Sequence, residues 1–200
     1  MRANGIDAWT LGVTKKKMKN ENLINKLQRR IAQISVGASA LRNQGAKGII
    51  EICRDYFENS IDLEEFRKEL ESDNYKKYLD RNTTELLNKF PENGKSWGAA
   101  RKGLNLFFRE VVYNFYLANH LGISANKDKN KKTLTQLEVP LDKDVATGLI
   151  EKFPELPKWK SIRRLTEKES QTYQETAFNY AERLQIPRIH LDLEFWRRDK

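Results

Sequence analysis

Apolar residues recur every three or four positions along most of this 200-residue chain, which is the spacing of one buried face of an α-helix. The spacing predicts helices over residues 20–36, 45–58, 82–90, 96–120, 144–153 and 167–184, with another that Asp62 caps. In residues 188–198 the apolar positions alternate as in a strand, but a final helix that contains Leu193 and Trp196 fits the all-α core equally well. No other stretch alternates like a series of strands, so the sequence predicts an all-α fold.

The helix predicted over residues 96–120 has the strongest pattern. Its apolar stripe follows the spacing i, i+4, i+7, i+11 at Leu104, Phe108, Val111 and Phe115, and is widened by Phe107, Val112 and Tyr116. We therefore expect this helix to be buried along its length. Gly122 ends it, and the polar, Lys-rich stretch 124–135 is predicted to be an exposed loop.

Composition limits the class of protein. With 38% hydrophobic and 10% aromatic residues the chain can form a core, and no stretch approaches the roughly 18 apolar residues of a membrane helix. No apolar run follows the basic start, so we expect no signal peptide and a cytoplasmic location. The single cysteine, Cys53, excludes an internal disulfide and a Cys-rich metal site, and its isoleucine neighbours indicate a buried thiol.

The net charge of +9 adds a possible partner. Neutralising phosphates is a common reason for such an excess, so nucleic acid is one candidate, and a surface that merely keeps the protein in solution is the other. Residues 1–20 lack periodicity and form a basic N-terminal arm, and residues 21–200 form one helical domain. Neither a Gly-rich phosphate loop nor a dinucleotide-binding fingerprint is present, so we expect no nucleotide cofactor.

Asp142 is the first candidate for chemistry. Pro140 disfavours helix before it, and Asp142 has the right side chain to cap the helix that follows. A carboxylate there lies in the positive field of the helix N-terminus, which favours its ionised form. Such a carboxylate can stabilise the sugar cation that forms when a glycosidic bond breaks, or can activate water. Most N-cap aspartates only cap a helix, and that alternative stays open.

A second segment, Gly98-Ala99-Ala100-Arg101-Lys102-Gly103, opens the long helix after a turn that contains Pro91 and Gly94. Small residues at a helix N-terminus let backbone N–H groups approach a phosphate. The alternative is that these small residues simply pack against the rest of the chain. A third segment, the Gly-flanked turn at Asn43 and Gln44, offers polar side chains at the junction of two helices.

Together these segments resemble the helix-hairpin-helix (HhH-GPD) DNA glycosylases, in the family's order along the chain: a wedge turn, a hairpin helix and a Pro-x-Asp segment. The resemblance implies a bundle of two packed helical lobes, with the hairpin and catalytic segment at about residues 83–153. The hairpin at residues 91–97 is longer than in the family. In addition, 40 positions separate Lys102 from Asp142, which an insertion at 124–135 would explain.

The same resemblance assigns roles to residues. Asp142 would drive cleavage of the N-glycosidic bond of a modified or damaged base, in repair or in defence against phage DNA. Lys102 would attack the sugar C1′ in a lyase step, which requires a lowered pKa from burial or from a cation such as Arg101. The DNA contacts would be Asn43, Gln44, Gly94, Lys95, Gly98 and Arg101, and the tentative base pocket Trp97, Trp159, Tyr173 and Trp196.

Double-stranded DNA is then the expected partner, of a monomer without metal, cofactor or membrane contact. His190 lies two positions from Asp192, and a structural pair between them is the simplest interpretation. Two other functions remain open: a non-catalytic DNA-binding module that uses the same hairpin, and a basic helical domain that binds an acidic protein.

Overall fold

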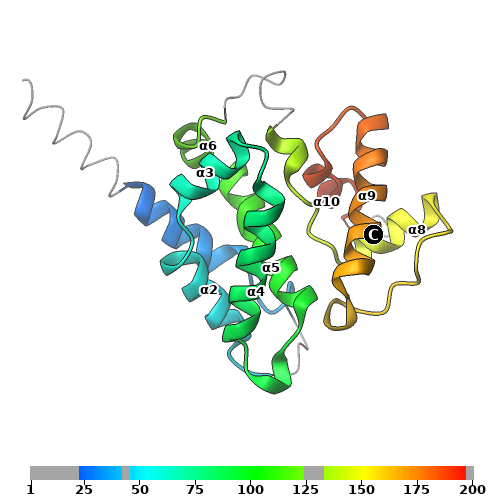
Figure 1. The fold of residues 1–200 in the computed structure, drawn as a ribbon, viewed down its shortest axis with the longest axis horizontal. Coiled ribbons are helices and arrows are strands. Elements are labelled where there is room, and N and C mark those ends of the chain that lie inside the picture. The colour runs from blue at the N-terminus through cyan, green and yellow to red at the C-terminus, as the bar shows by residue number, and fades with distance from the viewer. Residues whose placement is uncertain (1–22, 42–45, 124–132, 197–200) are drawn as a thin grey trace, which may run out of the picture.

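The computed structural model describes residues 23–41, 46–123 and 133–196, and within these ranges the chain forms helices and turns without a strand. The all-α prediction is therefore confirmed (Figure 1). The labelled helices are, in chain order, α2 (Ile49–Asn59), α3 (Leu63–Glu71), α4 (Tyr75–Lys89), η1 (Glu92–Gly94), α5 (Trp97–Tyr113), α6 (Phe115–His120), α8 (Lys143–Lys152), η2 (Ile162–Arg164), α9 (Glu167–Arg183), η3 (Arg188–His190) and α10 (Leu191–Glu194). Residues 23–35 and 133–136 are helical as well.

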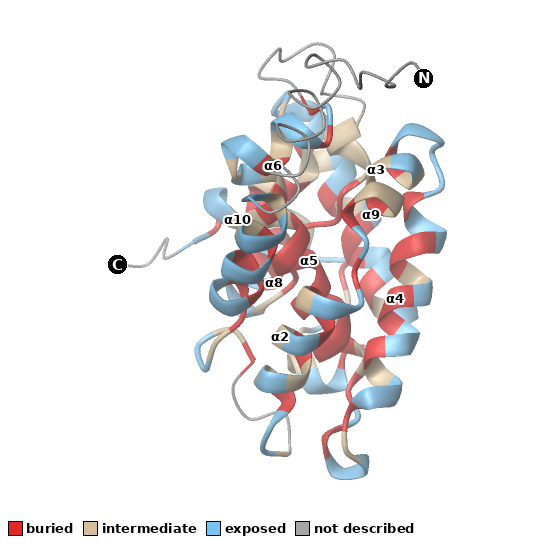
Figure 2. Cartoon of the chain, turned by 90° about the vertical axis from the view of Figure 1, so that its left-hand side faces the viewer, coloured by how far each residue is buried: buried red, intermediate tan, exposed pale blue. Residues whose placement is uncertain are grey.

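Buried apolar side chains gather in two clusters, as expected for two packed lobes. The first cluster is built mainly from residues 31–123, and the second from residues 139–195. Helix α5 lies between them, because it packs on α4 on one side and on η2 and α9 on the other. Figure 2 shows α5 buried over most of its surface, whereas α4 exposes its outer side to solvent.

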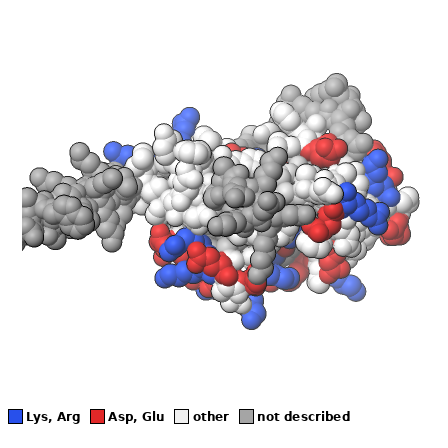
Figure 3. All heavy atoms as spheres, turned by 90° about the horizontal axis from the view of Figure 1, so that it is seen from above, with Lys and Arg blue, Asp and Glu red and all other residues white. Residues whose placement is uncertain are grey.

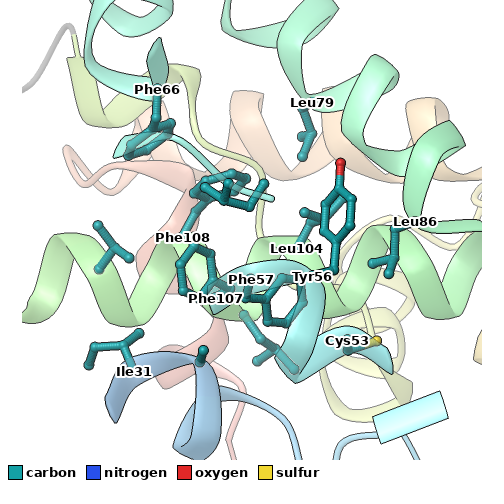
Figure 4. Close-up of a cluster of buried hydrophobic side chains, with 14 of the residues drawn as sticks. Ile31, Cys53, Tyr56, Phe57, Phe66, Leu79, Leu86, Leu104, Phe107 and Phe108 are labelled. Atoms are coloured by element: carbon teal, nitrogen blue, oxygen red, sulfur yellow. The ribbon is translucent and has the colours of Figure 1, made fainter. Parts of the chain in front are cut away.

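Two aromatic stacks fix α5 in the first cluster (Figure 4). Phe107 stacks on Phe57 of α2 with ring centroids 4.8 Å apart, and Phe108 stacks on Phe66 of α3 at 4.4 Å. All four rings are fully buried. Burying a phenylalanine side chain contributes about 1.5–3 kcal/mol to the stability of the fold. Two adjacent residues of α5 therefore hold two different helices, α2 and α3, in place. Cys53 lies in the same cluster, and burial raises the pKa of its thiol to about 12.

The prediction of one helix over residues 96–120 was wrong at Asn114. The backbone of Asn114 is extended, and its side chain accepts a hydrogen bond from the backbone N–H of Leu117 at 3.1 Å, so it caps a new helix, α6. The change of direction buries Leu117 and turns Phe115 and Tyr116 outward, where they are 66% and 60% exposed. Both had been expected in the buried stripe.

Other boundaries also differ from the prediction. Helix α4 begins at Tyr75, seven positions before the expected start at residue 82, and buries Tyr75, Tyr78 and Leu79 in the first cluster. The C-terminal stretch is helical in η3 and α10, which resolves the choice between strand and helix. The expected loop over residues 124–135 contains helical residues from 133 onward. Its part at 124–132, like the basic arm, lies outside the described residues.

Candidate functional site: a lysine–aspartate pair between the lobes

Asp142 caps α8 as the sequence predicted. Its backbone is extended, and Oδ1 accepts a hydrogen bond from the backbone N–H of Val145 at 3.0 Å. Val139 and Leu141 on either side of Pro140 are buried in the second cluster, so they anchor the approach to the helix. The carboxylate therefore lies at the positive end of α8 while its side chain stays 28% exposed.

Lys102 contacts this carboxylate. Its Nζ lies 3.2 Å from Oδ2 of Asp142, although 40 positions separate the two residues along the chain. The lysine side chain is only 6% exposed, and a buried ammonium group is tolerated only beside a partner. The two residues to which the resemblance assigned catalytic roles thus form one ion pair between α5 and α8.

A buried network holds the segment before Asp142 against α5. Both oxygens of Glu138 accept hydrogen bonds from Arg101, at 2.8 and 2.9 Å, and one of them also accepts from Asn105 at 3.1 Å. Burial disfavours the charge of Glu138, yet the Arg101 guanidinium and these hydrogen bonds bring the pKa of Glu138 below its ordinary value. Burial alone would lower the pKa of Arg101, but the negative charges of Glu138 and Asp80 outweigh this effect and raise it.

Two further side chains hold the same segment from the other lobe. The amide of Gln174 on α9 donates to the carbonyl of Val139 at 2.7 Å and accepts from its N–H at 3.1 Å. Arg188 donates to the carbonyls of Gln136 and Leu137 at 3.0 and 3.1 Å. Burial lowers the pKa of Arg188. Residues 136–142, which we call the aspartate segment, are thus fixed by side chains of both lobes.

Sequence reasoning did not predict Glu138, Gln174 or Arg188 as parts of the site. A weak signal existed for Glu138, the one charged residue in the otherwise apolar stretch from Leu137 to Leu141. Gln174 lies on the buried side of α9 beside Tyr173, where an amide needs partners. Arg188 gave no local signal, because its hydrogen-bond partners lie 14 or more positions away.

The glycines of the hairpin that precedes α5 pack closely against other parts of the chain. A Cβ at Gly98 would lie 2.2 Å from the carbonyl oxygen of Ile162, and one at Gly94 would lie 2.7 Å from the Cβ of Ala46. The glycines are therefore needed for close packing within the chain, and the phosphate contact expected of the backbone N–H groups stays a prediction. Lys95 is exposed but pairs with Glu92.

Arg101 is also unsuited to the DNA contact expected of it. Its side chain is only 4% exposed, and its donors bond to Glu138 and to the hydroxyl of Thr83 at 2.9 Å. The guanidinium also lies 5.3 Å from the centre of the Trp97 ring. Arg101 therefore holds the protein together instead of facing a phosphate.

The turn with Asn43 and Gln44 lies outside the described residues, so the wedge role keeps its status as a prediction. The described residues on either side of the turn approach the hairpin and α5. Ala46 packs at Gly94, and the side chain of Leu41 lies 3.8 Å from a Cβ placed at Gly103, next to Lys102.

The four aromatic residues expected to form a base pocket do not gather in one pocket. Trp97 lines a cavity beside α5. Trp159 and Tyr173 pack edge to face with centroids 5.8 Å apart, and the Tyr173 hydroxyl donates to the carbonyl of Pro157. Trp196 is 61% exposed after α10. The expected pair of His190 with Asp192 is also absent: Nδ1 of His190 lies 2.7 Å from the Tyr113 hydroxyl, and Asp192 pairs with Arg109.

The positive charge is unevenly distributed along the chain. The described residues contain equal numbers of basic and acidic side chains, so the whole excess of +9 falls in residues 1–22, 42–45, 124–132 and 197–200. On the face seen in Figure 3, acidic and basic side chains are interspersed, without one continuous basic field. Any strong attraction to a polyanion must therefore involve these four stretches.

Within the described ranges, His, Cys, Asp and Glu side chains do not gather in threes or more as a metal site would require. No helix in that part of the chain has the length and apolar character needed to cross a membrane. Searches of protein-family models, curated proteins and solved structures gave no match to this chain.

Proposed function

We propose that this protein is a DNA glycosylase in which Asp142 and Lys102 act on the glycosidic bond of a base extruded from duplex DNA. The observation that carries the proposal is the 3.2 Å contact between Lys102 Nζ and Asp142 Oδ2. The resemblance to helix-hairpin-helix glycosylases proposed these residues from two separate motifs, and the fold brings them into contact.

The chemistry follows from the position of the carboxylate. As the C1′–N bond breaks, its electron pair leaves with the base and positive charge develops on the sugar. The ionised Asp142, at the N-terminus of α8, stabilises that charge or takes a proton from the water that adds to C1′. The aspartate segment is held by both lobes, so the carboxylate keeps its position without reorganising.

Lys102 permits a second outcome. Its ammonium group becomes a nucleophile after passing a proton to Asp142, and the neutral amine then forms a bond to C1′ as the base departs. Loss of the ring C–O bond gives an imine, from which elimination of the 3′ phosphate breaks the strand. Without this attack, the product is an intact strand with an abasic site.

The experiment uses duplex DNAs with normal, damaged and phage-type modified bases, and reveals abasic sites with hot alkali. We expect cleavage by the wild type and a loss of about 10²–10⁴-fold in Asp142→Asn. Asp144→Asn is the matched control, because it removes an exposed carboxylate from the first turn of the same helix. Borohydride should trap a protein–DNA adduct that Lys102→Met cannot form. Equal cleavage by wild type and Asp142→Asn would refute the proposal.

A second candidate is a helical domain that binds an acidic protein. One observation favours it over a hairpin that grips phosphates: Gly94 and Gly98 pack closely against Ala46 and Ile162, so these glycines have a structural role that needs no DNA. This function predicts no cleavage of any DNA and no salt-dependent DNA binding. The glycosylase must bind DNA more weakly as salt rises.

A further inference from the structure

A cavity of about 250 Å³ lies between α4 and α9, beside α5. Its inner wall includes the buried residues Tyr75, Glu138 and Ser170, and its mouth is formed by exposed residues of α4 and α9. The volume is below the range of about 300–1,000 Å³ that is usual for drug-sized ligands. A ligand of one or two fused rings fits this space.

The cavity is distinct from the Lys102–Asp142 pair, and neither of these residues lines it. Arg101 does line it, and successive helical residues point about 100° apart, so Lys102 points to another side of α5. Between the cavity and the pair lies the network that fixes the aspartate segment. Five cavity residues belong to this network: Arg101, Gln136, Glu138, Gln174 and Arg188.

The wall has the chemistry to hold a flat polar ring. Trp97 and Tyr75 supply aromatic surface. The Tyr75 hydroxyl is buried and has no hydrogen-bond partner among the described residues, which is a costly arrangement unless a ligand supplies one. Burial raises the pKa of Tyr75, so the hydroxyl stays protonated and can donate a hydrogen bond.

The mouth selects against phosphates. Glu167 and Glu175 line it from α9, and the ammonium group of Lys76 on α4 is already 2.8 Å from Asp80. The two guanidinium groups that line the cavity, those of Arg101 and Arg188, bond to Glu138 and to backbone carbonyls, so an anion at the mouth meets the exposed carboxylates, which repel it at close range. A free base enters more readily than a nucleotide or a DNA strand.

We propose that this cavity binds an uncharged heterocycle of nucleobase size and thereby regulates the site at Asp142, the regulatory part resting on the proposed function. A bound ring contacts the side chains that hold the aspartate segment, so its binding alters how firmly Asp142 is positioned. A free base is also what the proposed reaction releases, which makes the ligand class available wherever the enzyme works.

Isothermal titration with adenine, cytosine, uracil and hypoxanthine tests the binding, with the corresponding nucleoside monophosphates in parallel. Gln171→Trp places a bulky ring at the mouth, and Thr172→Trp is the matched control at the next exposed position of α9. We expect at least one base to bind wild type and Thr172→Trp, and to bind Gln171→Trp with at least tenfold lower affinity. The nucleoside monophosphates should bind wild type with at least tenfold lower affinity than the free base. Absence of binding to wild type, or equal binding to both variants, overturns the proposal.

Cleavage assays separate a free base from one extruded out of DNA. If the cavity takes a free base, Gln171→Trp cleaves DNA as wild type does, and added base changes the cleavage rate of wild type and Thr172→Trp but not that of Gln171→Trp. If Gln171→Trp abolishes cleavage, the cavity receives the extruded base and the regulatory proposal is wrong. If wild type cleaves no DNA yet binds a base, the proposed function fails and the cavity assignment stands.

Discussion

Replacing Glu138 by Gln tests whether the network holds the two lobes together. The glutamate accepts three hydrogen bonds, two from Arg101 and one from Asn105. A glutamine has one accepting oxygen, so its NH₂ group must face a donor of Arg101 or Asn105 in either orientation. The substitution therefore leaves a buried guanidinium without its main counter-charge.

The expected loss follows from the burial of the pair. Removing one partner of a buried ion pair costs about 3–5 kcal/mol. Arg101 retains Asp80 at 2.8 Å, on a side chain that is 34% exposed, so the lower end applies. We expect Glu138→Gln to lower the free energy of unfolding by about 3 kcal/mol, measured by urea denaturation at pH 7. The double variant Arg101→Met/Glu138→Leu should recover at least half of this loss, because an apolar pair leaves no unpaired charge.

The pH dependence gives an independent check. The folded-state pKa of Glu138 lies below the ordinary value of 4.5, so its ion pair stabilises the fold fully above that pH. The stabilisation is lost as the pH falls from 4.5 through the lower folded-state pKa. Glu138→Gln should lack this part of the acid dependence. A loss below 1 kcal/mol at neutral pH would show that other contacts position the aspartate segment.

Gly98→Ala should cost about 1–3 kcal/mol in urea denaturation, because its Cβ meets the Ile162 carbonyl, whereas Gly37→Ala, with open space around it, should change stability by less than about 0.5 kcal/mol. Cys53 should resist Ellman's reagent at pH 8 in the folded protein and react once urea unfolds it; rapid reaction of the folded protein would contradict its burial. Deleting residues 1–22, which contain five Lys and Arg, should flatten the salt dependence of DNA binding, and an unchanged slope would place the contacts elsewhere.

The features that the sequence predicted well depend on neighbours a few positions away. Asp62 and Asp142 cap helices because each accepts a hydrogen bond from an N–H two or three residues later, and local sequence contains both partners. Asn114 shows the limit of this reasoning. Apolar spacing favoured one continuous helix through it, yet its side chain can cap a new one, and only the packing of Leu117 decides between them.

The role of Arg101 could not be predicted because its partners are distant in sequence. A basic residue at the start of a helix fits a phosphate contact as well as an internal ion pair. The deciding carboxylates, Asp80 and Glu138, lie 21 positions before it and 37 after it. The same holds for Gly98, whose close neighbour Ile162 lies 64 positions later in the chain.

The two ion pairs between α5 and the aspartate segment are unequal in a way that bears on function. Arg101–Glu138 is buried on both sides and bidentate, and it already attaches the segment to α5. Lys102–Asp142 adds a single contact whose carboxylate is 28% exposed, and the cost of burying the Lys102 ammonium group offsets much of what the pair contributes to the stability of the fold. As an attachment it duplicates a stronger one four residues away. Lys102→Met should therefore cost little in stability while abolishing borohydride trapping, and a variant that unfolds instead would assign the pair to structure.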